Sequence, residues 1–141
     1  MIFRLSNIFG FEYSADGQRK NFFAQLLRNL RQHGDIRFDM SRDTRRDFLP
    51  VEACAKALVQ GVQQGLEGIY NLGSGFPVSC GEIADWVIDG YGDGRVVVAR
   101  DEIRDEFFLD MKKWHGIFPP IMTMTRLREA CTALGRRLRD A

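Results

Sequence analysis

A glycine-containing turn, Gly73-Ser74-Gly75, follows a short apolar run and precedes a helical pattern. A strand–turn–helix unit of this kind holds a dinucleotide pyrophosphate when a third glycine stands three residues after the second. Val78 occupies that position, and the sequence contains no Gly-Lys-Ser/Thr triplet. Ser79 and Glu82 instead have the spacing of a capping box, which satisfies the first helical amides internally. The pattern therefore favours a structural turn over a phosphate-binding loop.

Cysteine and histidine side chains form no recognisable catalytic or metal-binding set. The three cysteines are scattered, odd in number and outside any Cys-x-x-Cys motif, which is typical of reduced thiols. They are Cys54, Cys80 and Cys131. The two histidines, His33 and His115, have no companions at ligand spacing. We therefore expect no metal site and no disulfide.

Length and charge define a small protein without a polyanionic partner. The chain has 141 residues, 45% hydrophobic residues and a formal net charge of +1, which suits one domain with one core. The arginine-rich segment after residue 125 could indicate a nucleic-acid face. No aromatic residue is interleaved with its charges, so a solvated helix side is favoured. The sequence lacks both an apolar run of about 20 residues and a signal-peptide core, so we expect a cytoplasmic protein without membrane contact.

Strand and helix patterns alternate along the chain, which indicates an α/β fold. Strands are expected at 2–9, 36–40, 68–72 and 95–99, an extended segment at 45–51, and a loop at 10–20. Helices are expected at about 21–33, 51–65, 79–90 and 125–138. The helix at 51–65 should bury Val51, Ala55, Leu58 and Val62. The strand at 2–9 is apolar on both faces, as in the interior of a sheet.

Three sequence segments occur in a fixed order: RLSNIFG at 4–10, RRDFLPVEACAKAL at 45–58 and GIYNLGSGFPVSCGEIADWV at 68–87. Together they resemble the C-terminal half of the extended short-chain dehydrogenase/reductases, the NAD-dependent epimerase/dehydratase family. FFLDMKKW at 107–114 is similar to a later segment of that family. The resemblance implies an α/β fold in which the last parallel strands of a Rossmann-type domain join a small mixed substrate-binding domain. It also implies that residues 1–141 are a single fragment.

The family's catalytic Tyr-x-x-x-Lys motif has no counterpart in this sequence. Its four lysines are Lys20, Lys56, Lys112 and Lys113, and the residues four positions earlier are Asp16, Glu52, Phe108 and Leu109. The three-glycine loop that binds NAD or NADP in the intact family is also missing. We therefore expect the N-terminal dinucleotide-binding half to be absent, and the chain alone to bind no cofactor and to catalyse no reaction.

Five residues match, or lie close to, substrate-contacting positions of the family. The resemblance implies that Asn7 contacts substrate and that Arg46 and Arg100 grip the nucleotide phosphates. Arg46 could otherwise belong to a solvated charged face together with Asp47, and Arg100 to a surface salt bridge. Phe38 could lie along the nucleobase or simply in the core. Asn71 could meet substrate or tie down the turn at Gly73.

The resemblance implies the substrate-binding portion of an NAD(P)-dependent sugar-nucleotide epimerase, dehydratase or reductase, inactive in isolation. The expected ligand is a weakly bound nucleoside-diphosphate sugar. A separate N-terminal half or a second copy of the chain is the expected protein partner. The alternative is a non-catalytic nucleotide- or protein-binding module derived from the same family.

Overall fold

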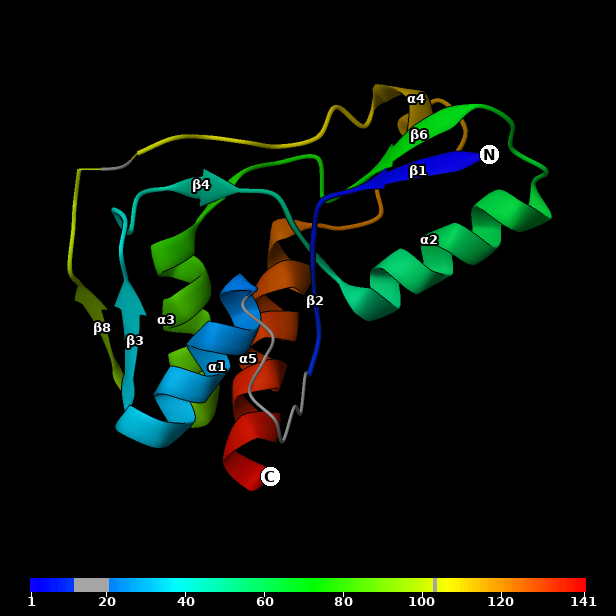
Figure 1. The fold of residues 1–141 in the computed structure, drawn as a ribbon. Helices are drawn as coiled ribbons and strands as arrows, with labels where there is room; N and C mark the ends of the chain where they lie inside the picture. The colour runs from blue at the N-terminus through cyan, green and yellow to red at the C-terminus, as the bar shows by residue number, and fades with distance from the viewer. Residues whose placement is uncertain (12–20, 103) are drawn as a thin grey trace.

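The computed structural model describes residues 1–11, 21–102 and 104–141, so the predicted loop at 10–20 lies mostly outside the described residues. Its elements alternate as an α/β fold, which confirms the expected class (Figure 1). The strands are β1 (Ile2–Leu5), β2 (Asn7–Phe9), β3 (Asp35–Phe38), β4 (Arg45–Arg46), β5 (Phe48–Pro50), β6 (Ile69–Leu72), β7 (Val78–Ser79) and β8 (Arg95–Val98). The helices are α1 (Phe22–His33), α2 (Val51–Gln63), α3 (Cys80–Tyr91), α4 (Lys112–His115) and α5 (Met124–Asp140).

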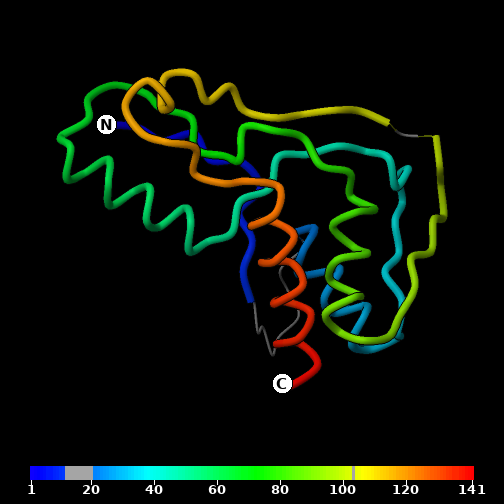
Figure 2. Tube along the Cα trace, turned by 180° about the vertical axis from the view of Figure 1, so that it is seen from behind, coloured from blue at the N-terminus to red at the C-terminus, as the bar shows by residue number. Residues whose placement is uncertain are grey.

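The described strands form pairs instead of one continuous sheet. Three pairs are parallel, β1–β6, β2–β5 and β3–β8, and β4–β7 is antiparallel. Figures 1 and 2 show two regions: β1, β6, α2 and α4 at one end, and α1, α3 and α5 with β3 and β8 at the other. The main core lies in the second region, between the three helices.

The helix boundaries follow from local capping. Asn21 caps α1 by accepting a hydrogen bond from the Ala24 amide at 2.7 Å, and Gly34 ends this helix in the left-handed conformation with φ 68°. At α3, Ser79 and Glu82 form the predicted capping box. Thr123 caps α5, which begins close to the predicted position. These three helices confirm the predictions from caps and apolar stripes.

The predicted strand at 2–9 is divided at Ser6. Its first part pairs with β6, up to the register Leu5↔Leu72. The Ser6 amide then donates to Leu72 O at 3.0 Å, whereas the Asn7 amide donates to Asp47 O at 3.2 Å. The chain thus changes partner from β6 to β5 within one residue. This crossing brings Asn7 next to the start of β5.

The prediction of the buried side of α2 was wrong. Val51 is 44% exposed and Val62 is 64% exposed, while Cys54, Ala57 and Gly61 face inward. Ala55 is also exposed and Leu58 is half-buried. The small inward residues permit close packing, since a methyl group on Gly61 would lie 2.9 Å from the Phe3 ring. The apolar stripe of α2 is therefore left on the surface.

Helices α3 and α5 approach each other at two glycines. A methyl group on Gly90 would lie 1.9 Å from Thr132 O, and one on Gly135 would lie 2.0 Å from Val87 O. Both contacts involve main-chain oxygens, so the two backbones touch directly. Within the described residues, no helix is long and apolar enough to cross a membrane.

Candidate functional site

Asp47 is fully buried at the start of β5, with 0% of its surface exposed. Its Oδ1 accepts hydrogen bonds from the Ser74 amide at 2.7 Å and the Ser74 hydroxyl at 2.8 Å. Its Oδ2 accepts from the amides of Gly75 at 3.1 Å and Leu109 at 3.2 Å. Four donors therefore satisfy one buried carboxylate, as the burial of a charge requires.

The Gly73-Ser74-Gly75 turn is a cradle for an anion that the chain itself supplies. Consecutive amides of a turn form a concave site for anions, and here the Asp47 carboxylate occupies it. A methyl group on Gly73 would lie 2.5 Å from Asp47 Oδ2, so this close approach requires glycine. The turn consequently does not fit a dinucleotide pyrophosphate, in agreement with the structural role predicted for it.

Asn7 lies beside Asp47. Its side-chain Nδ2 donates to Asp47 O at 2.9 Å, and the Asn7 residue remains exposed. Asn71 lies elsewhere, where its Nδ2 donates to Asp110 O at 2.9 Å. Asn71 thus joins β6 to the segment before α4. The structure brings Asn7, but not Asn71, to the residue that follows Arg46.

Arg46 of β4 is held by its neighbour Arg45 and by Asp105. Its Nη1 lies 2.6 Å from Asp105 Oδ1, and also donates to Arg45 O at 2.9 Å and to Asp105 O at 3.4 Å. The Cys80 thiol lies nearby, and burial is the main reason why its pKa is raised to about 11. The positive charge of Arg46 lowers this pKa by a smaller amount, and the negative charge of Asp105 raises it slightly. At neutral pH this thiol is protonated, so it is not a nucleophile.

Asp105 belongs to a segment that we call the strap, residues 99–109, of which 103 is not described. Figure 1 shows it in yellow, running from β8 past β4 towards α4. The Arg45 amide donates to Asp105 O at 2.9 Å and the Phe107 amide donates to Arg45 O at 3.1 Å. A hydrogen bond from the buried Ser41 holds the pKa of Asp101 below its ordinary value. The strap is thus fastened to Ser41 of the connector between β3 and β4 and to Arg45 of β4.

Arg100 lies at the start of the strap, and its Nε is 3.1 Å from Asp39 Oδ1. Both side chains are well exposed, at 64% and 72%. Arg46 is fastened five residues further along the strap, at Asp105. Each arginine therefore forms an ion pair between the strap and the chain around β3 and β4. Arg100 of the strap pairs with Asp39, and Arg46 of β4 pairs with Asp105 of the strap.

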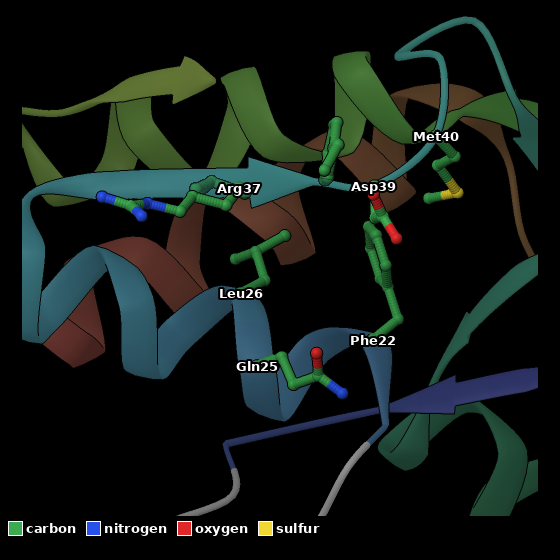
Figure 3. Close-up of a pocket in the computed structure, with 8 residues that line it drawn as sticks. Phe22, Gln25, Leu26, Arg37, Asp39 and Met40 are labelled. Carbon is green, nitrogen blue, oxygen red and sulfur yellow. The ribbon is translucent and has the colours of Figure 1, made fainter. Parts of the chain in front are cut away.

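A shallow hollow of about 200 Å³ lies between α1 and β3, next to Asp39 (Figure 3). Phe22, Leu26 and Phe38 supply apolar lining, and the Phe22 and Phe38 rings stack with centroids 5.8 Å apart. Phe38 itself is buried in the main core, with 4% exposed. Figure 3 shows the Phe22 and Asp39 side chains at the same end of the hollow.

Sequence reasoning did not find four residues of this region: Phe22, Asp39, Asp47 and Asp105. Asp39 directly follows Phe38, and Phe22 belongs to the apolar stripe of the helix predicted at 21–33, but neither pattern indicates a site residue. Asp47 carried a signal, because it is a single acid that directly precedes the apolar residues Phe48 to Val51. Asp105 could be found only from the pairing of the strap with β4.

The arrangement is that of an α/β protein built on Rossmann-type parallel strand pairs. Solved structures of similar fold include UDP-N-acetylglucosamine 4-epimerases from Methanobrevibacter ruminantium M1 (15% identity, TM-score 0.75, covering 95% of this chain and 44% of that one) and from Bacillus cereus (19%, 0.73, 97% and 47%). RMD from Pseudomonas aeruginosa, solved with NADPH, is also similar (18%, 0.74, 98% and 48%). The chain thus spans less than half the length of these relatives.

The sequence pattern of the NAD dependent epimerase/dehydratase family matches residues 1–73, just over half of the 141 residues. The chain belongs to this family. The resemblance found in the sequence segments is therefore confirmed, as is the α/β fold with Rossmann-type parallel strands.

Proposed function

We propose that this chain is the substrate-binding portion of a sugar-nucleotide epimerase, dehydratase or reductase, and that its ligand is a nucleoside-diphosphate sugar. The observation that carries the proposal is the order of groups along the connector and strap. The aromatic hollow lies at the β3 end of the connector, where Arg100 pairs with Asp39 at the edge of the hollow. Arg46 lies at the β4 end, where it pairs with Asp105.

Each part of this region suits one part of such a ligand. Phe22 offers an apolar surface for a nucleobase, and the buried Phe38 ring is stacked against it in the core. Arg46 and Arg100 are cations able to bind phosphate oxygens by charge-assisted hydrogen bonds. Asn7 donates to the main-chain oxygen of Asp47, the residue that follows Arg46, and its exposed amide group can contact the sugar there. UDP sugars suit the proposal because UDP-N-acetylglucosamine is named for two of the similar epimerases.

We also propose that a dinucleotide-binding half completes the site by packing on the exposed apolar surface of α2 and β1. Val51, Val59 and Val62 of α2 are 44–64% exposed, and Ile2 and Leu5 of β1 are 60% and 49% exposed. Parallel strands are usually buried on both faces, and two-stranded sheets are rarely stable alone. The similar structures are about twice as long as this chain, which is the length that such a half requires.

The Gly73-Ser74-Gly75 turn does not fit NAD or NADP, because Asp47 occupies its amides. In this proposal the cofactor, and hydride transfer with it, belong to the other half. The residues of this chain bind and orient the nucleotide. The chain by itself is then expected to be inactive.

The first prediction concerns Arg46. UDP titrated into the isotope-labelled chain should shift resonances of Arg46, Asp39 and Phe22, with an affinity that falls as salt rises. Arg46→Ala should weaken binding by about 1.5–3 kcal/mol, the value of a hydrogen bond to a charged group. Arg46→Lys should recover only part of this affinity, since an ammonium cannot donate from a planar edge. NMR titration measures all three.

Arg42→Ala is the matched control, because Arg42 lies on the same connector and pairs with Asp85 on α3. Its UDP affinity should equal that of the unaltered chain. If no resonance near Arg46 moves at millimolar UDP, or if Arg46→Ala binds as well as Arg42→Ala, the site assignment is wrong.

A further inference from the structure

Within the described part of the chain, the partners of the Arg46 guanidinium all lie at one of its three nitrogens. Asp105 Oδ1, Asp105 O and Arg45 O all lie at Nη1. Among the residues that the structure describes, no hydrogen-bond acceptor is recorded for Arg46 Nε or Nη2. Phosphate groups are bound best by two parallel donors on one edge of a guanidinium. The Nε–Nη2 edge provides such a pair while Nη1 stays with Asp105.

We propose that Asp105 is a positioning residue, which fixes Nη1 of Arg46 so that the Nε–Nη2 edge is presented to the ligand phosphate. This inference rests on the proposed function, because it concerns the same arginine and the same class of ligand. It adds to that site a residue that does not itself contact the ligand, contributed by the strap and located 59 positions from Arg46 in sequence.

The backbone of the strap places Asp105 firmly enough for this role. The Arg45 amide donates to Asp105 O at 2.9 Å, and the Phe107 amide donates to Arg45 O at 3.1 Å. Two residues further on, the Leu109 amide donates to the buried Asp47 carboxylate at 3.2 Å. The strap is thus anchored on both sides of Glu106, next to β4. An arginine that is oriented before its ligand arrives loses less side-chain entropy on binding.

Orientation of Arg46 favours phosphate binding, whereas the negative charge of Asp105 opposes it. A carboxylate near the guanidinium repels the phosphate and so weakens the net attraction. The Arg46 side chain is 27% exposed and that of Asp105 is 59% exposed, so solvent screens this repulsion. Orientation should therefore outweigh repulsion. Two substitutions separate the effects: Asp105→Ala removes the acceptor and the charge, whereas Asp105→Asn removes only the charge.

UDP affinity of these variants tests the proposal. Asp105→Ala should weaken UDP binding about three- to fivefold, the range expected for the loss of one exposed ion pair. Asp105→Asn should bind UDP at least as tightly as the unaltered chain, because its side-chain oxygen still accepts from Nη1. Glu106→Ala is the matched control: it breaks the neighbouring Arg45–Glu106 pair at 3.1 Å on the same strap and should leave the affinity unchanged.

Tighter UDP binding by Asp105→Ala would show that Asp105 competes with the ligand, and would overturn the proposal. Unchanged binding by Asp105→Ala, or equal losses for Ala and Asn, would also overturn it. Nitrogen-15 relaxation of Arg46 Nε in the ligand-free chain provides a second readout. Its order should fall in Asp105→Ala and persist in Asp105→Asn. If UDP fails to bind the unaltered chain, the proposed function fails, and this relaxation measurement still decides whether Asp105 orients Arg46.

Discussion

At the scale of single residues, Asp47 joins three separate parts of the chain. Its carboxylate oxygens bind the turn at 74–75 and the strap at Leu109, and its main-chain oxygen binds Asn7. The flanking residues Arg46 and Phe48 belong to the candidate site and to the core, respectively. The geometry of the site therefore depends on a residue that does not itself reach the surface.

Asp47→Asn should destabilise the fold although it preserves the shape of the side chain. One carboxylate oxygen is replaced by an NH₂ group, which faces amide donors and cannot accept from them. The free energy of unfolding should fall by about 3 kcal/mol or more, since hydrogen bonds to a buried charge are lost. Urea denaturation measures the change. Asp85→Asn, at the exposed pair with Arg42, should cost less than about 1 kcal/mol; equal losses in the two variants would contradict the role of Asp47.

Part of the candidate site could be found from sequence. Arg46 and Asn7 were singled out because their segments matched family motifs, and the structure places both beside Asp47. Asp47 was named only as a member of the charged run around Arg46, for which a solvated face was the alternative, and its burial was not predicted. Its burial depends on four donors, which come from residues 27, 28 and 62 positions away. No local pattern contains that information.

At the scale of elements, α3 and α5 cross with their backbones in contact at Gly90 and Gly135. The ends of both helices were predicted within about two residues, because caps and apolar stripes are local features. Their crossing was not predicted, because it requires two glycines on different helices to face each other. In the same way, the exposed side of α2 depends on what packs on the helix and not on its periodicity alone.

Gly135→Ala should be strongly destabilising. The added methyl group would lie 2.0 Å from Val87 O, so the two helices must separate. The free energy of unfolding should fall by about 3 kcal/mol, at the upper end of the usual cost of overpacking. Gly116→Ala is the control, because its nearest contacts are main-chain oxygens at 3.5 Å and its φ is −69°. Thermal melts of the two variants should differ clearly, and similar melts would mean that the α3–α5 contact adapts easily.

At the scale of the whole molecule, α2 and β1 both leave large apolar side chains exposed, and we call these side chains together the apolar surface of the two elements. They are Ile2, Leu5, Val51, Val59 and Val62. Strand β1 is paired only with β6 among the described strands, so its other edge has unpaired main-chain groups. Surfaces and edges of this kind promote association.

The isolated chain should therefore self-associate through this surface. Val59→Lys combined with Val62→Glu should shift the sedimentation profile towards monomer without lowering the melting temperature, because both valines are more than half exposed. Met124→Lys is the control, since Met124 is 46% exposed but lies on α5. A strictly monomeric chain at all accessible concentrations, or equal effects of the two variants, would contradict this role of the surface.

The pairing of β1 with β6 also has a consequence during synthesis. Leu5 pairs with Leu72, so 67 further residues must be made after Leu5 before its partner exists. At a translation rate of roughly 5–20 residues per second, β1 waits about 3–13 s for β6. During that interval, the amides of β1 and the side chains of Ile2 and Leu5 are available to other nascent chains or to chaperones. Among the described strand pairs, β1 and β6 are thus separated by the longest stretch of chain, since Asp35 and Arg95 of the pair β3–β8 lie 60 residues apart and Asn7 and Phe48 of the pair β2–β5 lie 41 apart.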